Sequence, residues 1–261
     1  MIPAMPAICA QSGWLMKMTS FDAKGAAEQL LAARRTLIAT ERLSADRTPA
    51  TIEEGYKVQN FQIEKLGALG GYKAGAAPDA VERILAPIPA DAVHSSGSRL
   101  NAADYRPGWV EVEFAFRILA PITETDIIGR EDLKKIAEFV PVIEILATRF
   151  SDIMALTTPE IVADLGVNGA IIVGHGSGCA IPPPLEDLKI FVDGKEFCPN
   201  FMSPADPLDT CLWLINRKQA AGSVMSAGTV ITTGTIIRPL TVKGNIEARF
   251  SELYYVSAML I

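Results

Sequence analysis

The sequence predicts an α+β protein in which a short helical region precedes a β-rich body. The first quarter of the 261 residues has the apolar periodicity of amphipathic helices. From about residue 68 onwards, glycine, proline and β-branched residues become frequent, and short apolar runs alternate with turn signals. We therefore place a helical N-terminal region at residues 1–67 and a β-rich body at residues 68–261.

Two helices are expected in the N-terminal region. Residues 22–43 form the first, because their larger apolar side chains recur at helical spacing on one face. Thr51 and Glu54 form a T-x-x-E capping box ahead of the second, and Gly67 supplies its stop signal.

The body is expected to contain short strands interrupted by two helices. One helix covers about residues 131–139, and the other begins at Asp206 and Pro207, a cap followed by proline at the first helical position, and ends near Gly222. The candidate strands cover residues 109–119, 169–174, 188–193, 229–233 and 246–260.

Composition and charge exclude several classes of protein. The net charge of −6 and the lack of a basic run argue against nucleic-acid binding. No apolar stretch approaches the ~20 residues that span a bilayer. Residues 1–20 are mildly hydrophobic, but no positive residue precedes their apolar part, so we expect no secretory signal. Four scattered cysteines without C-x-x-C spacing argue against structural zinc, and a reducing cytoplasm is the expected location.

Two glutamates in the segment 110–116 are the first candidate ligands. Side chains alternate between the faces of a strand, so Glu111 and Glu113 share one face while Val110 and Val112 share the other. Two carboxylates on one face suit a hard cation such as Mg²⁺. The alternative is a half-buried strand with a solvated acidic face.

Glu144 is a third candidate because it lies inside the nearly continuous apolar run 140–147. A carboxylate is costly to bury there unless it is paired or bound to a metal. The alternative is a buried salt bridge, for example to Arg149.

Lys73 lies in the glycine-rich segment 70–75. Glycines let the backbone approach a ligand closely, and a partly desolvated lysine near a metal is expected to have a lowered pKa and to exchange protons. An exposed lysine on a turn is the alternative.

The remaining polar motifs carry less information. Asp164 is either a catalytic carboxylate or a turn former, and its local sequence favours the turn. Residues 174–178 (GHGSG) lack the Lys-Ser/Thr of a phosphate loop, and the chain has no G-x-S-x-G elbow, so phosphate-loop and serine-hydrolase functions are rejected.

Taken in order, these segments resemble the 2-oxopent-4-enoate hydratase and 4-oxalocrotonate decarboxylase family, within the fumarylacetoacetate hydrolase superfamily. The resemblance runs from about Thr51 to the C-terminus. The matching pieces are 71–75 (GYKAG), 110–113 (VEVE), 142–144 (VIE) with Arg149, 162–164 (VAD), 206–208 (DPL) with Trp213 and Leu214, 227–228 (AG) and 233–234 (TG).

The resemblance implies a mixed β-roll or β-sandwich body of the fumarylacetoacetate hydrolase C-terminal type, with a smaller helical N-terminal region. It implies a homo-oligomer and a Mg²⁺ or Mn²⁺ ion. The implied site residues are the metal ligands Glu111, Glu113 and Glu144, the catalytic residues Lys73, Asp91 and Asp164, and the substrate-binding residues Arg149 and Gly75.

The implied function is a hydratase that adds water to a 2-hydroxy-2,4-dienoate and gives a 4-hydroxy-2-oxo acid. Three rival functions are a 4-oxalocrotonate-type decarboxylase, an acylpyruvate-type carbon–carbon hydrolase and a non-catalytic partner subunit. The chain departs from the family pattern at Ala76–Pro78, which lack a hydroxyl residue, at Leu165 in place of asparagine, and at Asn245 in place of aspartate. These departures leave the proposed metal ligands in place and bear on the substrate.

Overall fold

The computed structural model describes residues 20–76, 82–202, 205–237 and 239–261. The expectations for residues 1–19 and for Ala77 and Pro78 lie outside the described residues. Within these ranges no helix is both long and apolar enough to cross a membrane.

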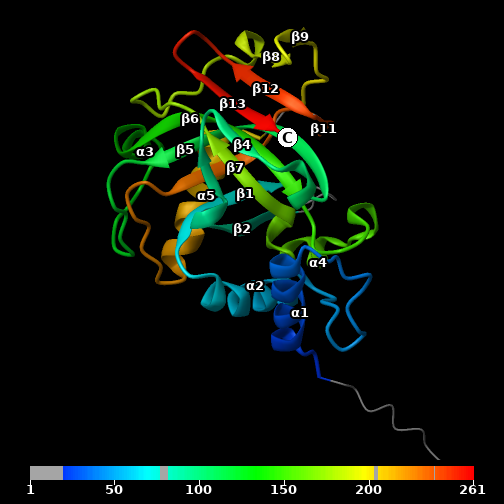
Figure 1. The fold of residues 1–261 in the computed structure, drawn as a ribbon. Coiled ribbons are helices and arrows are strands. Elements are labelled where there is room, and N and C mark those ends of the chain that lie inside the picture. The colour runs from blue at the N-terminus through cyan, green and yellow to red at the C-terminus, as the bar shows by residue number, and fades with distance from the viewer. Residues whose placement is uncertain (1–19, 77–81, 203–204, 238) are drawn as a thin grey trace, which may run out of the picture.

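Two β-sheets form the body, and the α+β class is confirmed (Figure 1). All strand pairs are antiparallel except β1/β10, β3/β7 and β4/β13. The eight-stranded sheet has the order β2 (Arg83–Pro89), β1 (Leu69–Ala76), β10 (Val230–Thr235), β5 (Pro107–Ile118), β6 (Ala137–Ala147), β7 (Asn168–Val173) and β3 (Val93–Ser95), with β11 (Leu240–Thr241) paired to β5. The five-stranded sheet has the order β4 (Ser98–Leu100), β13 (Tyr255–Leu260), β12 (Gly244–Arg249), β8 (Lys189–Val192) and β9 (Lys195–Phe197).

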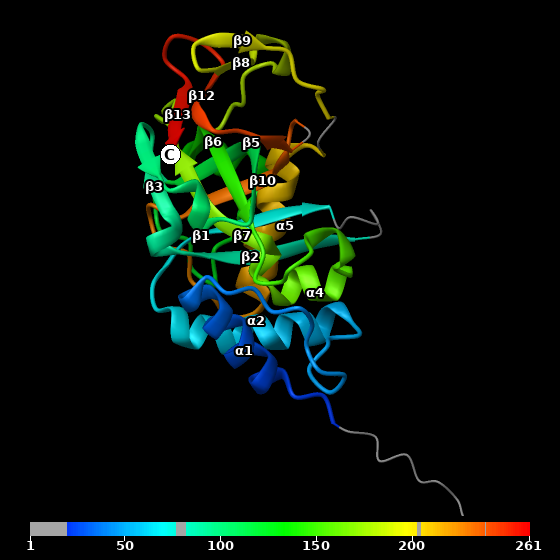
Figure 2. The ribbon, with the colours of Figure 1, turned by 45° about the vertical axis from the view of Figure 1, so that its right-hand side comes forward.

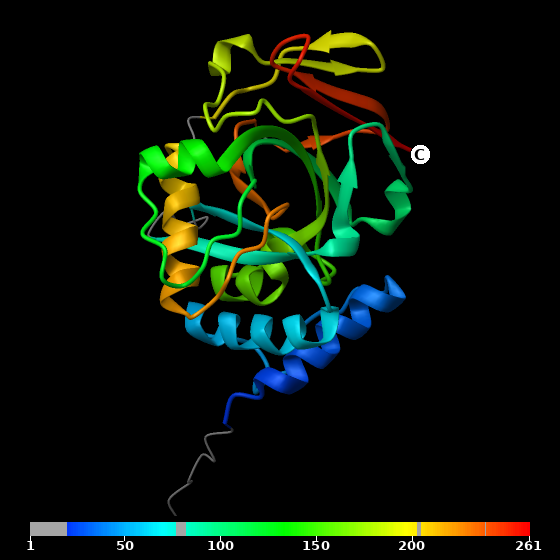
Figure 3. The same cartoon turned by 90° about the vertical axis from the view of Figure 1, so that its left-hand side faces the viewer.

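α1, α2 and α4 lie at the end of the larger sheet away from the smaller one, and α3 and α5 lie along its side (Figures 2 and 3). α1 (Ala23–Thr36) packs on α2 (Ile52–Leu66), and α2 packs on α4 (Thr158–Ala163). α3 (Arg130–Ile136) and α5 (Pro207–Ala220) pack against each other. The division at residues 67 and 68 stays a prediction, because α4 of the body belongs to the same helical layer as α2.

The capping residues begin two helices as predicted. The Thr51 side chain accepts a hydrogen bond from the Glu54 amide, and Asp206 accepts from the amides of Leu208 and Asp209. The first helix is shorter than predicted, because Leu37 adopts the left-handed conformation that ends α1.

Two other boundaries were wrong. Residues 137–139 begin strand β6 and do not extend α3, and residues 246–260 are the hairpin β12–β13 and not one strand. Every residue of β6 is buried. A strand buried on both faces has no polar alternation, which is why the pattern did not identify it.

The two faces of β5 point into different surroundings. Val110, Val112 and Phe114 belong to the apolar core between the two sheets. Ala115 lies on the other face, in a smaller apolar cluster with Val142 of β6. The predicted alternation therefore holds, and it directs the odd-numbered side chains into the curl of the larger sheet.

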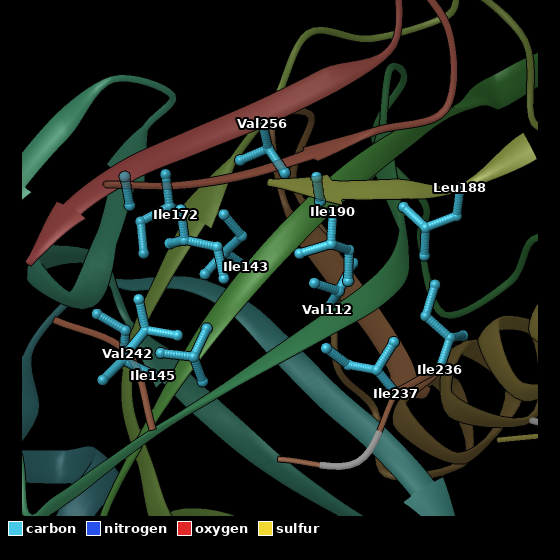
Figure 4. Close-up of a cluster of buried hydrophobic side chains, with 14 of the residues drawn as sticks. Val112, Ile143, Ile145, Ile172, Leu188, Ile190, Ile236, Ile237, Val242 and Val256 are labelled. Atoms are coloured by element: carbon cyan, nitrogen blue, oxygen red, sulfur yellow. The ribbon is translucent and has the colours of Figure 1, made fainter. Parts of the chain in front are cut away.

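The core between the sheets is mainly aliphatic (Figure 4). It also contains a cluster of aromatic rings. Phe139 of β6 lies 5.7 Å from Phe114 and 5.6 Å from Phe250, measured between ring centroids. Because Phe250 follows β12, this cluster joins the two sheets.

Phe139→Ala is expected to lower the free energy of unfolding by about 3–5 kcal/mol, because it leaves a cavity between the sheets. Phe197→Ala is the matched control, since Phe197 is 40% exposed and its loss should cost less than about 0.5 kcal/mol. Urea-induced unfolding measures both, and equal losses would contradict the described core.

Candidate metal centre and its cavity

Three glutamates meet on the inner face of the curled sheet. Strands β5 and β6 pair with Glu111 directly opposite Glu144, and Glu113 lies two residues along β5. One carboxylate oxygen of each residue lies within 4.8 Å of those of the other two. The structure thus brings together the three predicted ligands, and the solvated acidic face is excluded for Glu113 and Glu144, which are buried.

Lys73 of β1 is the basic side chain of this group. Its Nζ donates to Glu144 Oε1 at 2.7 Å and to the Gly166 carbonyl at 3.0 Å. Asn168 Nδ2 donates to the same Glu144 oxygen at 3.0 Å. Lys73 is therefore a fixed, partly buried strand residue and not an exposed lysine on a turn.

One oxygen of the carboxylate group has no partner among the described residues. Glu144 Oε2 is buried and accepts no hydrogen bond. Burying an unpaired carboxylate oxygen is unfavourable, and a hard divalent cation is the ligand that three clustered carboxylates suit. The donor set therefore fits Mg²⁺ or Mn²⁺ held by Glu111, Glu113 and Glu144.

Burial and mutual repulsion shift the pKa values of these groups. Burial first, and then the Glu144 charge, raise the pKa of Glu111 to about 7 and raise the pKa of Glu113 well above its usual range. Burial lowers the pKa of Lys73, but the three carboxylates outweigh it and leave that pKa raised. The expected lowered pKa of Lys73 is thus wrong for the metal-free protein.

A cavity of about 360 Å³ opens beside the carboxylates. Gly75 lines it, as its predicted substrate-binding role requires. Lys73, Glu111 and Glu113 are the charged side chains among the described lining residues. The apolar part of the wall is formed mainly by Ile84, Leu85, Ala86, Leu146, Ile161, Val167, Met202 and Ala205.

Arg149 and Asp164 do not line this cavity. The Asp164 carboxylate accepts from Arg149 Nε, from the Arg149 amide at 3.0 Å and from Thr148 Oγ1 at 2.7 Å. The other guanidinium nitrogens of Arg149 donate to the carbonyls of Asn168 and Asp164. Both side chains are engaged in a buried ion pair, so the geometry supports a positioning role for them and not direct contact with substrate.

Asp91 is not brought to the cavity. It is an exposed residue in a short 3-10 helix (Ala90–Ala92) between β2 and β3. Its predicted catalytic role has no support in this arrangement.

A left-handed turn behind the cavity was not predicted. Leu165, Gly166 and Val167 have φ values of 53°, 62° and 52°. Only glycine adopts this conformation easily, so a leucine and a β-branched valine there are strained. The turn aims the Gly166 carbonyl at Lys73, and the glycine within VADLGVNG was the available signal.

The comparisons with known proteins support the fold. No protein-family model matches the sequence, and no curated protein matches it. 4-Oxalocrotonate decarboxylase from Pseudomonas putida G7, in complex with magnesium and adipate, superposes with a TM-score of 0.74 at 20% identity, over 92% of this chain and 97% of that one. The chain has the fold of this enzyme.

Two further structures agree with this result. The same decarboxylase in complex with calcium and acetate gives a TM-score of 0.73 at 20% identity, over 92% of this chain and 97% of that one. 5-Carboxymethyl-2-hydroxymuconate delta-isomerase from Mycobacterium smegmatis gives 0.52 at 15% identity, over 74% and 80% of the two chains. The predicted mixed β body of the fumarylacetoacetate hydrolase type, with its smaller helical region, is confirmed.

Cation affinity is expected to increase as the pH rises through about 7. Glu111 and Glu113 have raised pKa values, so below them the carboxylates hold protons that the cation must displace. Calorimetric titration with Mn²⁺ in two buffers of different ionisation enthalpy measures affinity and proton release. An affinity that does not change with pH would contradict the site. Glu186→Gln, an exposed acid-to-amide change, is the control and should bind Mn²⁺ as the wild type does.

Gly166→Ala is expected to destabilise the protein more than Gly97→Ala. Both glycines have positive φ, at 62° and 85°, which costs about 1–2 kcal/mol for alanine. A Cβ at Gly166 would also lie 3.0 Å from Lys73 Cδ and from Ala86 Cβ, whereas one at Gly97 meets nothing within 4 Å. Urea-induced unfolding of the two variants gives the comparison, and equal losses would show that Gly166 does not restrain Lys73.

Proposed function

We propose that the protein is a divalent-metal-dependent enzyme of the fumarylacetoacetate hydrolase superfamily that hydrates a 2-hydroxy-2,4-dienoate of the 2-oxopent-4-enoate type. The observation that carries the proposal is the cluster of three carboxylates with Lys73 beside a cavity whose other described lining residues are mainly apolar. The product would be a 4-hydroxy-2-oxo acid, and we expect the active form to be a homo-oligomer.

The cation and the side chains of the cavity would have different roles in the proposed hydration. Held by Glu111, Glu113 and Glu144, Mg²⁺ or Mn²⁺ would supply Lewis-acid stabilisation of negative charge on the 2-oxygen of the substrate. We expect the 2-oxo acid group of the substrate to lie beside these carboxylates. The apolar walls hold the hydrocarbon end of the substrate and limit the entry of bulk water.

Lys73 is the residue proposed to move protons. Hydration needs the 2-hydroxydiene to shift to an α,β-unsaturated ketone, with loss of the enol proton and gain of a proton at the terminal carbon. Water then adds at carbon 4. The Lys73 ammonium lines the cavity and is held by the Gly166 carbonyl and Glu144, so it can donate a proton at a fixed position.

The apolar wall favours hydration over decarboxylation. A 4-oxalocrotonate-type substrate carries a second carboxylate at the end remote from the 2-oxo acid group. Lys73 is the one cationic side chain among the described lining residues, and Glu144 already binds it. A second substrate carboxylate would therefore face aliphatic side chains and the hydroxyls of Thr210, Thr233 and Thr235, with no free cation to pair with among the described lining residues, at a cost in desolvation. A decarboxylase remains the second candidate, because the fold is shared with 4-oxalocrotonate decarboxylase.

A carbon–carbon hydrolase and a non-catalytic partner subunit have less support. The related hydrolases use a Glu–His pair, and neither His94 nor His175 is among the described residues lining the cavity. A non-catalytic subunit would retain the fold without the proton-donating arrangement, whereas Lys73 is held by two defined hydrogen bonds.

Incubation with 2-hydroxypenta-2,4-dienoate and Mg²⁺ is expected to add one water to the substrate, and EDTA should abolish the reaction. Glu113→Gln should lower turnover about 100-fold or more, as loss of a metal-centre group does, whereas Glu186→Gln should leave it unchanged. Mass spectrometry of the products measures both effects.

A parallel incubation with 4-oxalocrotonate distinguishes the second candidate. Loss of carbon dioxide from this substrate, without hydration of the first, would replace the hydratase by a decarboxylase. Metal-independent turnover, or full activity of Glu113→Gln, would refute the metal-site assignment.

A further inference from the structure

A second cavity, of about 200 Å³, lies next to the Arg149–Asp164 ion pair and is separate from the cavity at the metal centre. It is formed between the end of α1, the segment that precedes β5 and the end of β6. Arg149 contributes to its wall, but no lining residue is shared with the larger cavity. Its described walls are Ala33, Arg34, Leu37, Ala39, Ala103, Asp104, Tyr105, Arg106, Ala147, Thr148, Arg149 and Gly169.

Arg34 is the unusual residue of this cavity. Its Nη1 atom is buried and has no hydrogen-bond partner among the described residues, and none of the ion pairs formed there includes Arg34. Burial, followed by the nearby Arg149 charge, lowers the pKa of Arg34 to about 10. The guanidinium stays charged at neutral pH, so its buried Nη1 is a charged donor without a partner in a residue that is otherwise partly exposed, and this is unfavourable.

No neighbouring acid among the described residues forms an ion pair with Arg34. Asp164 and Asp91 act on Arg34 at a distance, and both lie outside the cavity wall. Asp164 is bound to Arg149, whereas Asp104 lines the cavity and accepts from Asn101 at 3.2 Å. Arg106, which is exposed, adds a further positive charge at the wall.

We propose that this cavity is a second ligand site, which binds a small organic carboxylate through Arg34. The carboxylate takes the free Nη1 donor, and Arg106 adds attraction at long range. The remaining wall is mostly apolar, with Ala33, Leu37, Ala147 and the Tyr105 ring, so an organic body suits it better than inorganic phosphate does.

This site is independent of the proposed reaction. Arg149 also lines the second cavity, but each of its three guanidinium nitrogens already donates a hydrogen bond, to Asp164 or to the Asn168 carbonyl, whereas Arg34 Nη1 donates none. Arg34 is therefore the residue on which affinity depends. Binding can be measured without turnover and without a metal, so failure of the hydratase proposal leaves this one testable.

Benzoate is the probe, titrated into the purified protein in Tris chloride with EDTA, with phosphate in a parallel series. Thermal unfolding and NMR saturation transfer are measured for wild type, Arg34→Met and Arg35→Met. Arg34→Met keeps the aliphatic stem and removes the donor, while Arg35→Met makes the same change at an exposed neighbour. Benzoate is expected to bind wild type and Arg35→Met equally, and to bind Arg34→Met at least about 10-fold more weakly.

The unfolding temperature without added anion provides a second, independent readout. Because the buried Nη1 of Arg34 has no partner among the described residues, Arg34→Met should unfold at the same or a higher temperature than wild type. A clear decrease would show that Arg34 has a structural partner and would overturn the proposal.

The titrations give the remaining outcomes. Equal benzoate affinity in all three proteins, or no binding to any, would overturn the proposal. Phosphate that binds as tightly as benzoate with the same Arg34 dependence would overturn the assignment to an organic carboxylate. Arg34→Gln, which also removes the charge, is measured as a second variant and should lose benzoate affinity to the same extent as Arg34→Met.

Discussion

The burial of three carboxylates on the inner face of one curled sheet is the constraint on which the site depends. Each charge would be costly to place in an apolar interior alone. The register of β5 and β6 sets Glu111 against Glu144, so their charges repel each other across the ladder. Lys73 and the Asn168 amide offset part of this repulsion, while burial first, and then the Glu144 charge, keep the pKa values of Glu111 and Glu113 raised. A divalent cation would remove the rest, which links the stability of this region to metal binding.

The position of Lys73 depends in turn on the strained turn at residues 165–167. A leucine and a valine in the left-handed region persist only where the surroundings fix them. The Arg149–Asp164 pair does this from behind, because Arg149 binds the Asp164 carboxylate and carbonyl before the turn and the Asn168 carbonyl after it. The ion pair therefore acts on the cavity through backbone geometry. Arg149 and Asp164 thus support the wall of the cavity without lining it.

The sequence predicted the parts of this site that follow from local pattern. Alternation in β5 placed Glu111 and Glu113 together, and an isolated carboxylate in an apolar run marked Glu144. Other features depend on contacts that no local pattern records. The two hydrogen bonds of Lys73 join β1 to Glu144 and Gly166, which lie 71 and 93 positions further along the chain. The direction in which the pKa of Lys73 shifts depends on how many carboxylates surround it. Strand β6 was not identified because burial on both faces removes the alternation of polar and apolar residues.

The fold alone does not select the reaction, because hydration and decarboxylation can both start from a substrate whose 2-oxo acid group lies at the metal centre. What separates them is the opposite end of the cavity, where a dicarboxylate needs a cationic partner and a simple dienoate needs only apolar contact. The aliphatic side chains of Ile84, Leu146 and Ile161 line this cavity, together with Thr210, Thr233 and Thr235. Arg34, whose buried Nη1 has no partner among the described residues, lines the second cavity, which shares no described wall residue with the first. Lys73 is thus the one cation among the described residues lining the first cavity, and this distribution of charge is the basis on which we propose a hydratase.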